Sequence, residues 1–445
     1  MATKRGILRR ALANAALLLG GKAGAGVLQL ATFALAARGL GFVDFGNFSV
    51  LIAQVMLVAG LAAFDTNQAI IRYGVVPIAE GDATRFQNLV KAGTLLDVGA
   101  AILAAAAVFL AAPLLGDWME WDARLIGLAQ LMAPLAFTNA IATPKGMLRA
   151  FGRFDLLSMH VTVTPLARLA GIALAWATDA PLIAYCLAWL CAGWVGAMVA
   201  LWLGWREAKR HGLLTGLTVR FHPRRDVEPG MWQFALLTNL NSSMTLLTNH
   251  LAVVVVGAIL GPGAAGLTRV AREVCVGIMK PVDLLNQALF PDLSRLVADG
   301  AWKRLTKSAV RAGMAGGIIG LAIAIVVYFA GDVLLGIVFG EEFTGAAWIL
   351  FVMVLSLAIR VFGFPAEPTL MAMGHAGIAF ASNFVAVALL IGALFWWLPL
   401  IGLNAVGYAF MVMNCVAAGI AFSAAATLVL RARRRTKLTA MSTAP

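Results

Sequence analysis

The chain has 445 residues, of which 61% are hydrophobic and 12% are charged. An average soluble domain is about 45–50% apolar and about 25% charged, so the composition excludes a soluble enzyme or a soluble binding domain. The formal net charge of +13 comes from short basic clusters between apolar runs. This distribution indicates signals of membrane topology rather than a surface for nucleic acid.

Twelve apolar stretches follow one another along the chain. A helix needs about 20 residues to cross a ~30 Å hydrocarbon core, and each stretch is near that length. They lie near residues 15–37, 47–71, 92–115, 125–148, 156–178, 182–204, 232–259, 268–290, 309–330, 346–370, 376–398 and 404–430. The stretch at 268–290 is the weakest, because charged residues interrupt it repeatedly. We therefore predict an all-α integral membrane protein of about twelve transmembrane helices.

The lysines and arginines lie almost entirely in alternate connections between these stretches. The N-terminus, the 205–231 loop and the tail from Arg431 to Lys437 belong to the basic set. The other connections hold Arg38 and Arg124 as their basic residues and are otherwise acidic where they are charged, as at Asp117 and Glu341. Because basic loops stay on the cytoplasmic side, this pattern predicts that both termini are cytoplasmic.

An internal repeat is indicated by two small-residue turns. Leu40-Gly41 and Leu260-Gly261 each begin a motif that closes with a further glycine, at Gly46 and at Gly266. Gly152 and Gly374 form a second pair with nearly the same separation along the chain. We predict two homologous six-helix bundles at 1–204 and 232–430, joined by a basic cytoplasmic linker at 205–231 and followed by a basic cytoplasmic tail at 431–445. The alternative is chance recurrence in a chain that contains 45 glycines.

Charged side chains occur inside the predicted spans, where each costs about 2.5–3.5 kcal/mol at a helix centre. Such residues normally face a wet cavity or a partner charge. The cations are Lys22, Lys145, Arg168, Arg269, Arg272, Lys280 and Arg360, and the acids are Asp65, Asp97, Glu273, Asp283 and Glu367. Seven cations against five acids predict an anionic cargo, and phosphate suits arginine and lysine.

A purely structural interpretation of these charges remains open. They could be ion pairs that hold helices together, for example Glu273 with Arg269 four residues earlier. The acids Asp65, Asp97, Glu273 and Asp283 could titrate or bind a coupling cation, or only balance neighbouring positive charges. The four cysteines lie in apolar stretches and the five histidines lack ligand spacing, so we expect no metal and no cofactor.

Several motifs resemble those of a known family. They are Arg38-Gly39-Leu40-Gly41 with Phe45-Gly46, Leu260-Gly261-Pro262 with Gly266, Arg269 to Glu273, Phe290-Pro291-Asp292-Leu293-Ser294, and Phe339-Gly340-Glu341-Glu342-Phe343. Their order over nearly the whole chain is similar to that of the lipid-linked oligosaccharide flippases, the polysaccharide-biosynthesis branch of the multidrug/oligosaccharidyl-lipid/polysaccharide exporter superfamily.

The resemblance implies a multi-pass protein of the bacterial inner membrane that is a transporter and not an enzyme. It implies alternating-access movement of a polyprenyl-diphosphate-linked glycan to the periplasmic leaflet, for O-antigen (lipopolysaccharide), capsule or exopolysaccharide biosynthesis. Its partners would be that glycan lipid, membrane lipids and the polysaccharide polymerase and export machinery, with no nucleic acid. Family members place cations on their first and eighth helices, which points to Lys22, Arg269 and Arg272 as headgroup contacts. Lysine replaces the usual arginine on the first span, and we expect twelve helices where many members have two more.

Two alternatives stay open. One is a cation-coupled small-molecule exporter of the same superfamily, which the excess of cations disfavours. The other is a membrane polymerase or ligase that acts on lipid-linked glycans, but such enzymes resemble chains with one large outward loop, and here the outward connections are short.

Overall fold

The computed structural model describes residues 4–64, 66–216, 230–231, 234, 239 and 243–442, and every regular element in this part is a helix. The chain divides into two compact units, residues 1–258 and 259–445. Residues 217–229 of the predicted linker lie outside the described part, and the predicted boundaries at 204 and 232 stay predictions.

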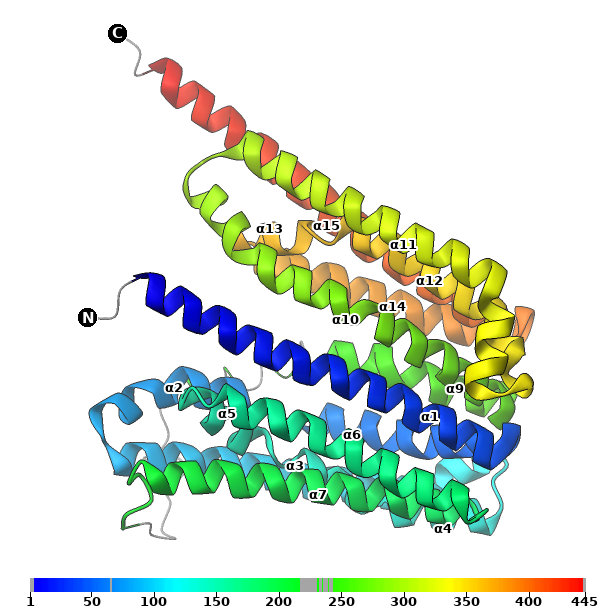
Figure 1. Cartoon of the computed structure of the whole chain (residues 1–445). Helices are drawn as coiled ribbons and strands as arrows, with labels where there is room; N and C mark the ends of the chain where they lie inside the picture. Colours follow the sequence, from blue (N-terminus) through cyan, green and yellow to red (C-terminus); the bar gives the residue numbers. More distant parts are fainter. Residues whose placement is uncertain are drawn as a thin grey trace. The chain divides into compact units, whose positions relative to one another are not determined.

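The first unit holds the helices up to the division between the units (Figure 1). They are α1 (Lys4–Ala62), α2 (Thr66–Glu80), α3 (Ala83–Trp118), α4 (Ala123–Met132), the 3-10 helix η1 (Ala133–Asn139), α5 (Ala142–Ala150), α6 (Phe154–Ala177), α7 (Leu182–Arg210), the π-helix η2 (Leu247–Leu251) and α9 (Ala252–Leu260), whose last residues cross the division.

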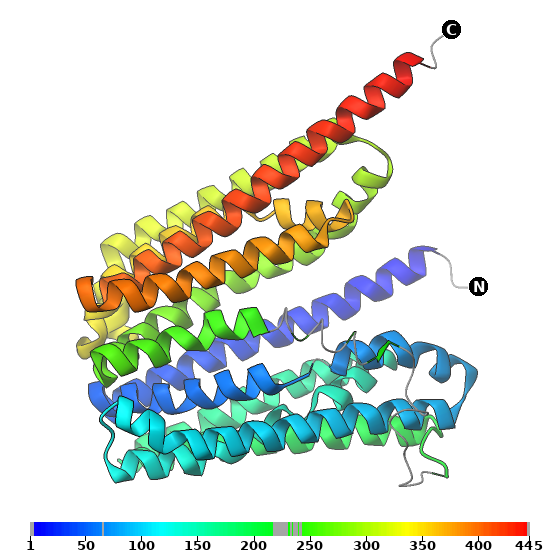
Figure 2. The ribbon, with the colours of Figure 1, turned by 180° about the vertical axis from the view of Figure 1, so that it is seen from behind.

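The second unit continues from that point. They are α10 (Pro262–Ala298), α11 (Trp302–Phe339), the 3-10 helix η3 (Glu341–Ala346), α12 (Ala347–Gly363), α13 (Ala366–Ala372), α14 (Ala376–Ile401) and α15 (Asn404–Ser442). Figure 2 shows α14 and α15 running side by side within this unit.

Within the described residues, ten helical segments are long and apolar enough to cross a membrane. One of them, Gly20–Ala62, has 43 residues, and at 1.5 Å per residue it would extend about 65 Å, twice the hydrocarbon core. α10 is long enough but is not among the ten, in agreement with the charges that weaken the predicted span at 268–290. The count of twelve spans and the cytoplasmic termini stay predictions.

Gly41 explains how one helical run can be so long. It interrupts α1 with φ 70° and ψ −177°, and its repeat counterpart Gly261 precedes α10 with φ 86° and ψ 176°. These dihedrals are accessible to glycine and strained for other residues. Gly152 and Gly374 also share a positive φ, of 71° and 82°. The paired turns predicted from the sequence therefore have similar backbone conformations, and the internal repeat itself stays a prediction.

Three predicted spans differ from the structure in their continuity. The span predicted at 346–370 is interrupted between the end of α12 at Gly363 and the start of α13 at Ala366. The span predicted at 47–71 is interrupted after Ala62, where α1 ends and α2 begins at Thr66. The span predicted at 125–148 consists of α4, the 3-10 helix η1 and α5 in succession. Hydropathy averages over a long window and therefore does not register a short break in a helix.

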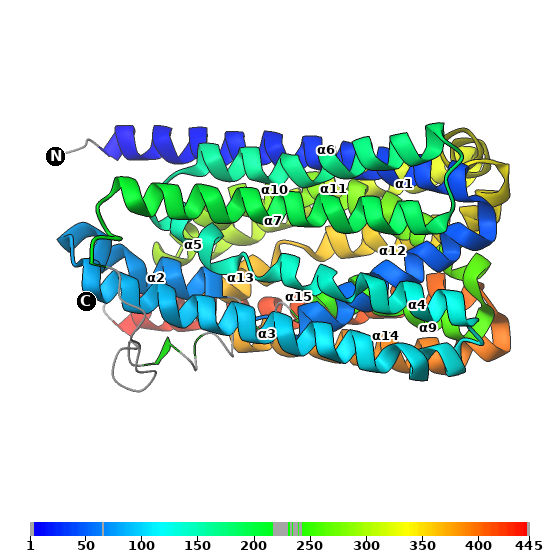
Figure 3. The same ribbon diagram turned by 90° about the horizontal axis from the view of Figure 1, so that it is seen from below.

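Small residues and aromatic rings hold the first unit together. Figure 3 shows α6 beside α7, where a Cβ on Gly171 would lie 2.9 Å from the Cβ of Ala188. The ring of Trp189 from α7 lies 5.2 Å from the Phe33 ring and 5.7 Å from the Phe48 ring of α1. Lipid gives helices no hydrophobic reason to associate, so close approach at small residues and ring packing supply the contacts.

Candidate functional site

Asp97 joins three helices inside the first unit. It lies on α3 with 5% of its surface exposed. The Thr66 hydroxyl of α2 donates to Oδ1 over 2.6 Å, and the Thr143 backbone N–H of α5 donates to Oδ2 over 2.8 Å. The two threonine hydroxyls lie 3.3 Å apart. A carboxylate predicted to couple or to balance charge is thus a structural acceptor as well.

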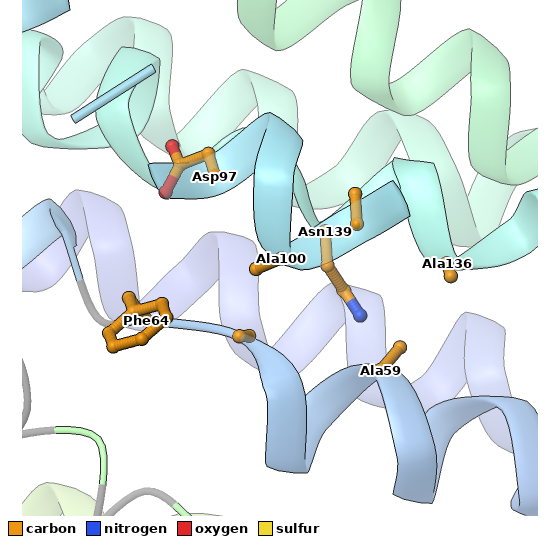
Figure 4. A pocket seen from close by; sticks show the side chains of 8 residues that line it. Ala59, Phe64, Asp97, Ala100, Ala136 and Asn139 are labelled. Atoms are coloured by element: carbon orange, nitrogen blue, oxygen red, sulfur yellow. The ribbon is translucent and has the colours of Figure 1, made fainter. Parts of the chain in front are cut away.

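The helix breaks explain why a carboxylate is placed there. The first backbone N–H groups of a helix have no acceptor within their own helix, and in lipid such groups must be satisfied by protein. Asp97 accepts from one of them at the start of α5 and from the side chain that begins α2. Figure 4 shows Asp97 and Asn139 beside a cavity of about 10 Å³ that Ala59 and Phe64 also line, about the smallest volume that holds one water.

The other predicted site residues of this unit lie on separate helices. Lys145 is half-buried on α5, two residues after Thr143. The guanidinium carbon of Arg168 on α6 lies 3.9 Å from the centroid of the Trp189 ring, a cation–π contact. Lys22 is exposed on α1, and Asp65 lies outside the described residues.

α10 carries two buried guanidinium groups in the second unit. Arg269 and Arg272 have exposed fractions of 5% and 8%. Arg269 Nη2 lies 2.7 Å from Glu273 Oε1, one turn along the same helix, so the ion pair considered from the sequence is present. The guanidinium carbon of Arg272 lies 4.7 Å from the centroid of the Phe410 ring of α15. Lys280 is half-buried further along α10, and the side chain of Asp283 lies outside the described part.

A polar cavity lies among α10, α12, α13, α14 and α15. It has a volume of about 70 Å³, and Arg360, Glu367, Ser382 and Asn383 are among its lining residues. Arg360 Nη1 donates to the Asn414 side-chain oxygen over 3.4 Å, and Asn414 Nδ2 donates to Ser356 Oγ over 2.9 Å. Asn383 Nδ2 donates to Glu367 Oε1 over 3.4 Å. A cation and an acid therefore share this cavity.

Corresponding helix breaks lie beside the polar groups of both units. α5 begins at Ala142 after η1, and α13 begins at Ala366 after the end of α12 at Gly363. Lys145 and Glu367 occupy the fourth and second positions of these short helices, and their separation along the chain matches that of Gly152 and Gly374. Interrupted membrane helices commonly mark ligand or ion sites, because the freed backbone groups can meet polar partners.

Comparisons with known proteins place these features in a family. A model of the polysaccharide biosynthesis protein family matches residues 11–297, well over half of the chain. The inner membrane protein YghQ of Escherichia coli (strain K12) is 28% identical over 341 residues, which cover 77% of this chain and 96% of that protein.

Solved structures show a similar fold. A multidrug resistance MATE family transporter of the MOP superfamily, in its inward-facing conformation, has a TM-score of 0.73 and 17% identity, covering 94% of this chain and 95% of that one. A MOP superfamily transporter from Pyrococcus furiosus Vc1 has a TM-score of 0.64 and 15% identity, covering 95% and 96%. The fold is thus that of membrane transporters of this superfamily.

Proposed function

This chain belongs to the polysaccharide biosynthesis protein family, and we propose on that premise that it flips a polyprenyl-diphosphate-linked oligosaccharide across the membrane. The direction is from the cytoplasmic to the periplasmic leaflet by alternating access, in the service of O-antigen, capsule or exopolysaccharide biosynthesis. The chain is a multi-pass protein of the inner membrane with the fold of a MOP-superfamily transporter, which supports a transport role.

The observation that carries the proposal is the pair of buried arginines on α10. Arg269 and Arg272 lie within one helical turn and are both at least nine-tenths buried. Two guanidinium groups so close together repel each other, and an anion that approached α10 at this turn would be attracted to both. Guanidinium groups bind phosphate oxygens through two parallel hydrogen bonds, which suits a diphosphate headgroup.

The remaining predicted cations extend this interpretation. Lys22, Lys145, Arg168, Lys280 and Arg360 would attract the headgroup toward the pathway, while the polyprenyl tail stays in lipid. An inside-negative potential also favours outward movement of an anion, by about 2.3 kcal/mol per charge per 100 mV. A diphosphate with two charges would gain about 4–5 kcal/mol at 100 mV, so this term alone can drive export.

The test is complementation of a host that lacks its own lipid-linked glycan flippase. Wild type is compared with Arg272→Gln at matched membrane abundance, and surface glycan is quantified. A lost charged hydrogen bond costs about 1.5–3 kcal/mol, so the substitution should reduce export at least about tenfold. Arg295→Gln is the matched control, because Arg295 is an exposed arginine near the other end of α10.

Three outcomes would count against the proposal. Normal export by Arg272→Gln would remove Arg272 from the headgroup site, and equal losses in Arg272→Gln and Arg295→Gln would indicate a general defect of α10. Failure of wild type in several glycan backgrounds would reject the cargo class itself.

A cation-coupled exporter is the second candidate function. Buried or half-buried carboxylates in both units, Asp97 and Glu367, support it, as does the similarity in fold to multidrug transporters. For the Pyrococcus furiosus transporter, reverse polarity of the binding pocket suggests a different function. The excess of cations in the present chain favours the anionic cargo, and uptake of a cationic dye by vesicles would favour the exporter instead.

A further inference from the structure

An apolar groove lies in the second unit between α11 and α15. Its volume is about 430 Å³. We call it the α11–α15 groove, and its walls include Leu305, Ala309 and Val310 of α11 and Phe422, Ala426 and Val429 of α15. Phe362 at the end of α12 and Ala366 at the start of α13 also line it.

The sequence explains why the helices leave this space. In the middle of α11, glycines allow close contact with α12: a Cβ on Gly313 would meet the backbone oxygen of Phe362, and one on Gly320 would lie 2.9 Å from Ala358. Near the start of α11 this glycine spacing ends. Alanines such as Ala309 and Ala426 then line both walls, and their short side chains leave the space between the helices unfilled.

The lining of the groove is apolar in its interior. Two lining threonines keep their hydroxyls on their own helices, since Thr306 donates to the backbone oxygen of Trp302 over 3.0 Å and Thr369 to that of Pro365 over 2.7 Å. Val310, Phe422 and Leu430 have exposed fractions of 43%, 51% and 54%. Exposed apolar side chains around an apolar groove favour a hydrocarbon occupant.

One end of the groove is basic. Arg433 lines it, one turn after Val429 on α15. At the start of α11, Lys303, Arg304 and Lys307 are exposed on either side of Leu305 and Thr306, which line the same groove. A basic group at the end of an apolar groove in a membrane helix pair is complementary to a lipid with an anionic headgroup.

We propose that the α11–α15 groove binds one acyl chain of an anionic phospholipid, with the lipid phosphate at Arg433. The volume lies within the range of about 300–1,000 Å³ that is typical of ligand pockets. A polyprenyl tail is longer than an acyl chain, so only part of it would fit in the groove. The site is separate from the predicted headgroup residues, and it does not depend on the identity of the transported cargo.

The experiment measures lipid binding to the full-length purified protein by native mass spectrometry. Phosphatidylglycerol is compared with phosphatidylcholine of the same acyl chains. Phosphatidylglycerol should bind more tightly, and Arg433→Gln should weaken it about fivefold, the effect of one basic side chain near an anionic surface. Arg431→Gln is the matched control, because Arg431 is exposed on the same helix end and is not among the residues that line the groove.

A second variant tests the acyl chain. Ala426→Trp fills the groove without altering charge and should abolish tight binding of phosphatidylglycerol while the thermal midpoint of the lipid-free protein is retained. If Ala426→Trp unfolds the protein, Ala309→Leu provides the same test with a smaller side chain. Equal binding of the two lipids, equal effects of Arg431→Gln and Arg433→Gln, or displacement by a polyprenyl phosphate at lower concentration would each overturn the proposal.

Discussion

The carboxylate of Glu273 lies 2.7 Å from the guanidinium of Arg269, on the next turn of the same helix, with both side chains almost fully buried. The pair is therefore local to α10, and its geometry follows from the four-residue spacing. Arg269 can have two roles, as a partner of Glu273 in the ion pair and as a contact of the cargo headgroup. Exchanging the two residues separates these roles.

The exchange is Arg269→Glu with Glu273→Arg. It preserves the ion pair, so membrane abundance and the thermal midpoint should stay close to those of wild type. Export should fall at least about tenfold, because the guanidinium that meets the headgroup has moved by one turn. The single change Arg269→Ala, which leaves Glu273 buried without this partner, should destabilise the protein by about 3–5 kcal/mol. Full export by the exchanged protein would mean that the pair is scaffold only.

Asp97→Ala should destabilise the first unit. It removes the acceptor of the Thr66 hydroxyl and of the Thr143 backbone N–H, both buried. Each orphaned donor costs about 1–3 kcal/mol, so the combined loss should be about 2–6 kcal/mol, measured as reduced stability to heat in detergent. Asp117→Ala is the control on the same helix, since Asp117 is exposed, and it should change little.

Gly261→Ala isolates the strain at the repeated turn. A Cβ at this position has open space around it, so the cost is the backbone conformation alone, about 1–3 kcal/mol. Gly277→Ala is the control, because it has the same open surroundings on α10 without a positive φ, and it should stabilise slightly. A similar response of the two variants in thermal unfolding would contradict the role given to the Gly261 backbone.

Substitution of Arg153 should destabilise the protein more than substitution of Glu207, the buried acid with which it pairs. Its Nη1 lies 2.7 Å from Glu207 Oε1 and its Nη2 lies 2.8 Å from Asp155 Oδ2, and these hydrogen bonds, first with Asp155 and then with Glu207, raise the pKa of the guanidinium. Arg153→Gln leaves the Glu207 carboxylate, 6% exposed, with Arg210 at 3.5 Å. We expect a loss of about 1–3 kcal/mol, against less than about 1 kcal/mol for Glu207→Gln. Thermal midpoints of both variants at one pH decide the order.

The sequence was most informative where the relevant signal is local. Hydropathy located most of the membrane helices, the recurring glycines predicted matching turns, and the spacing of Arg269 and Glu273 allowed their ion pair to be considered as an alternative. Three-residue or four-residue spacings on a helix are fixed by its pitch, so these inferences need no knowledge of the tertiary structure.

Contacts between distant parts of the chain were missed for the same reason. Thr66 and Thr143 lie 31 and 46 residues from Asp97, and the Arg168 contact with Trp189 joins two helices. Pro134 and Pro144 both lie inside the span predicted at 125–148, and proline is typical of a helix start, so these two residues could have located the break before α5. The partner of that helix start could not be predicted without the packing of α3.

An interrupted membrane helix often serves as a hinge, because the break has no continuous backbone ladder to resist bending. In the first unit the opposite consequence follows from Asp97. A single carboxylate fastens the start of α2 and the start of α5 to α3, so bending at either break would have to remove a buried hydrogen bond at the same time. The hydrogen bonds to Asp97 therefore stiffen this part of the unit despite the two breaks. Movement during a transport cycle should displace α2, α3 and α5 together as one rigid body.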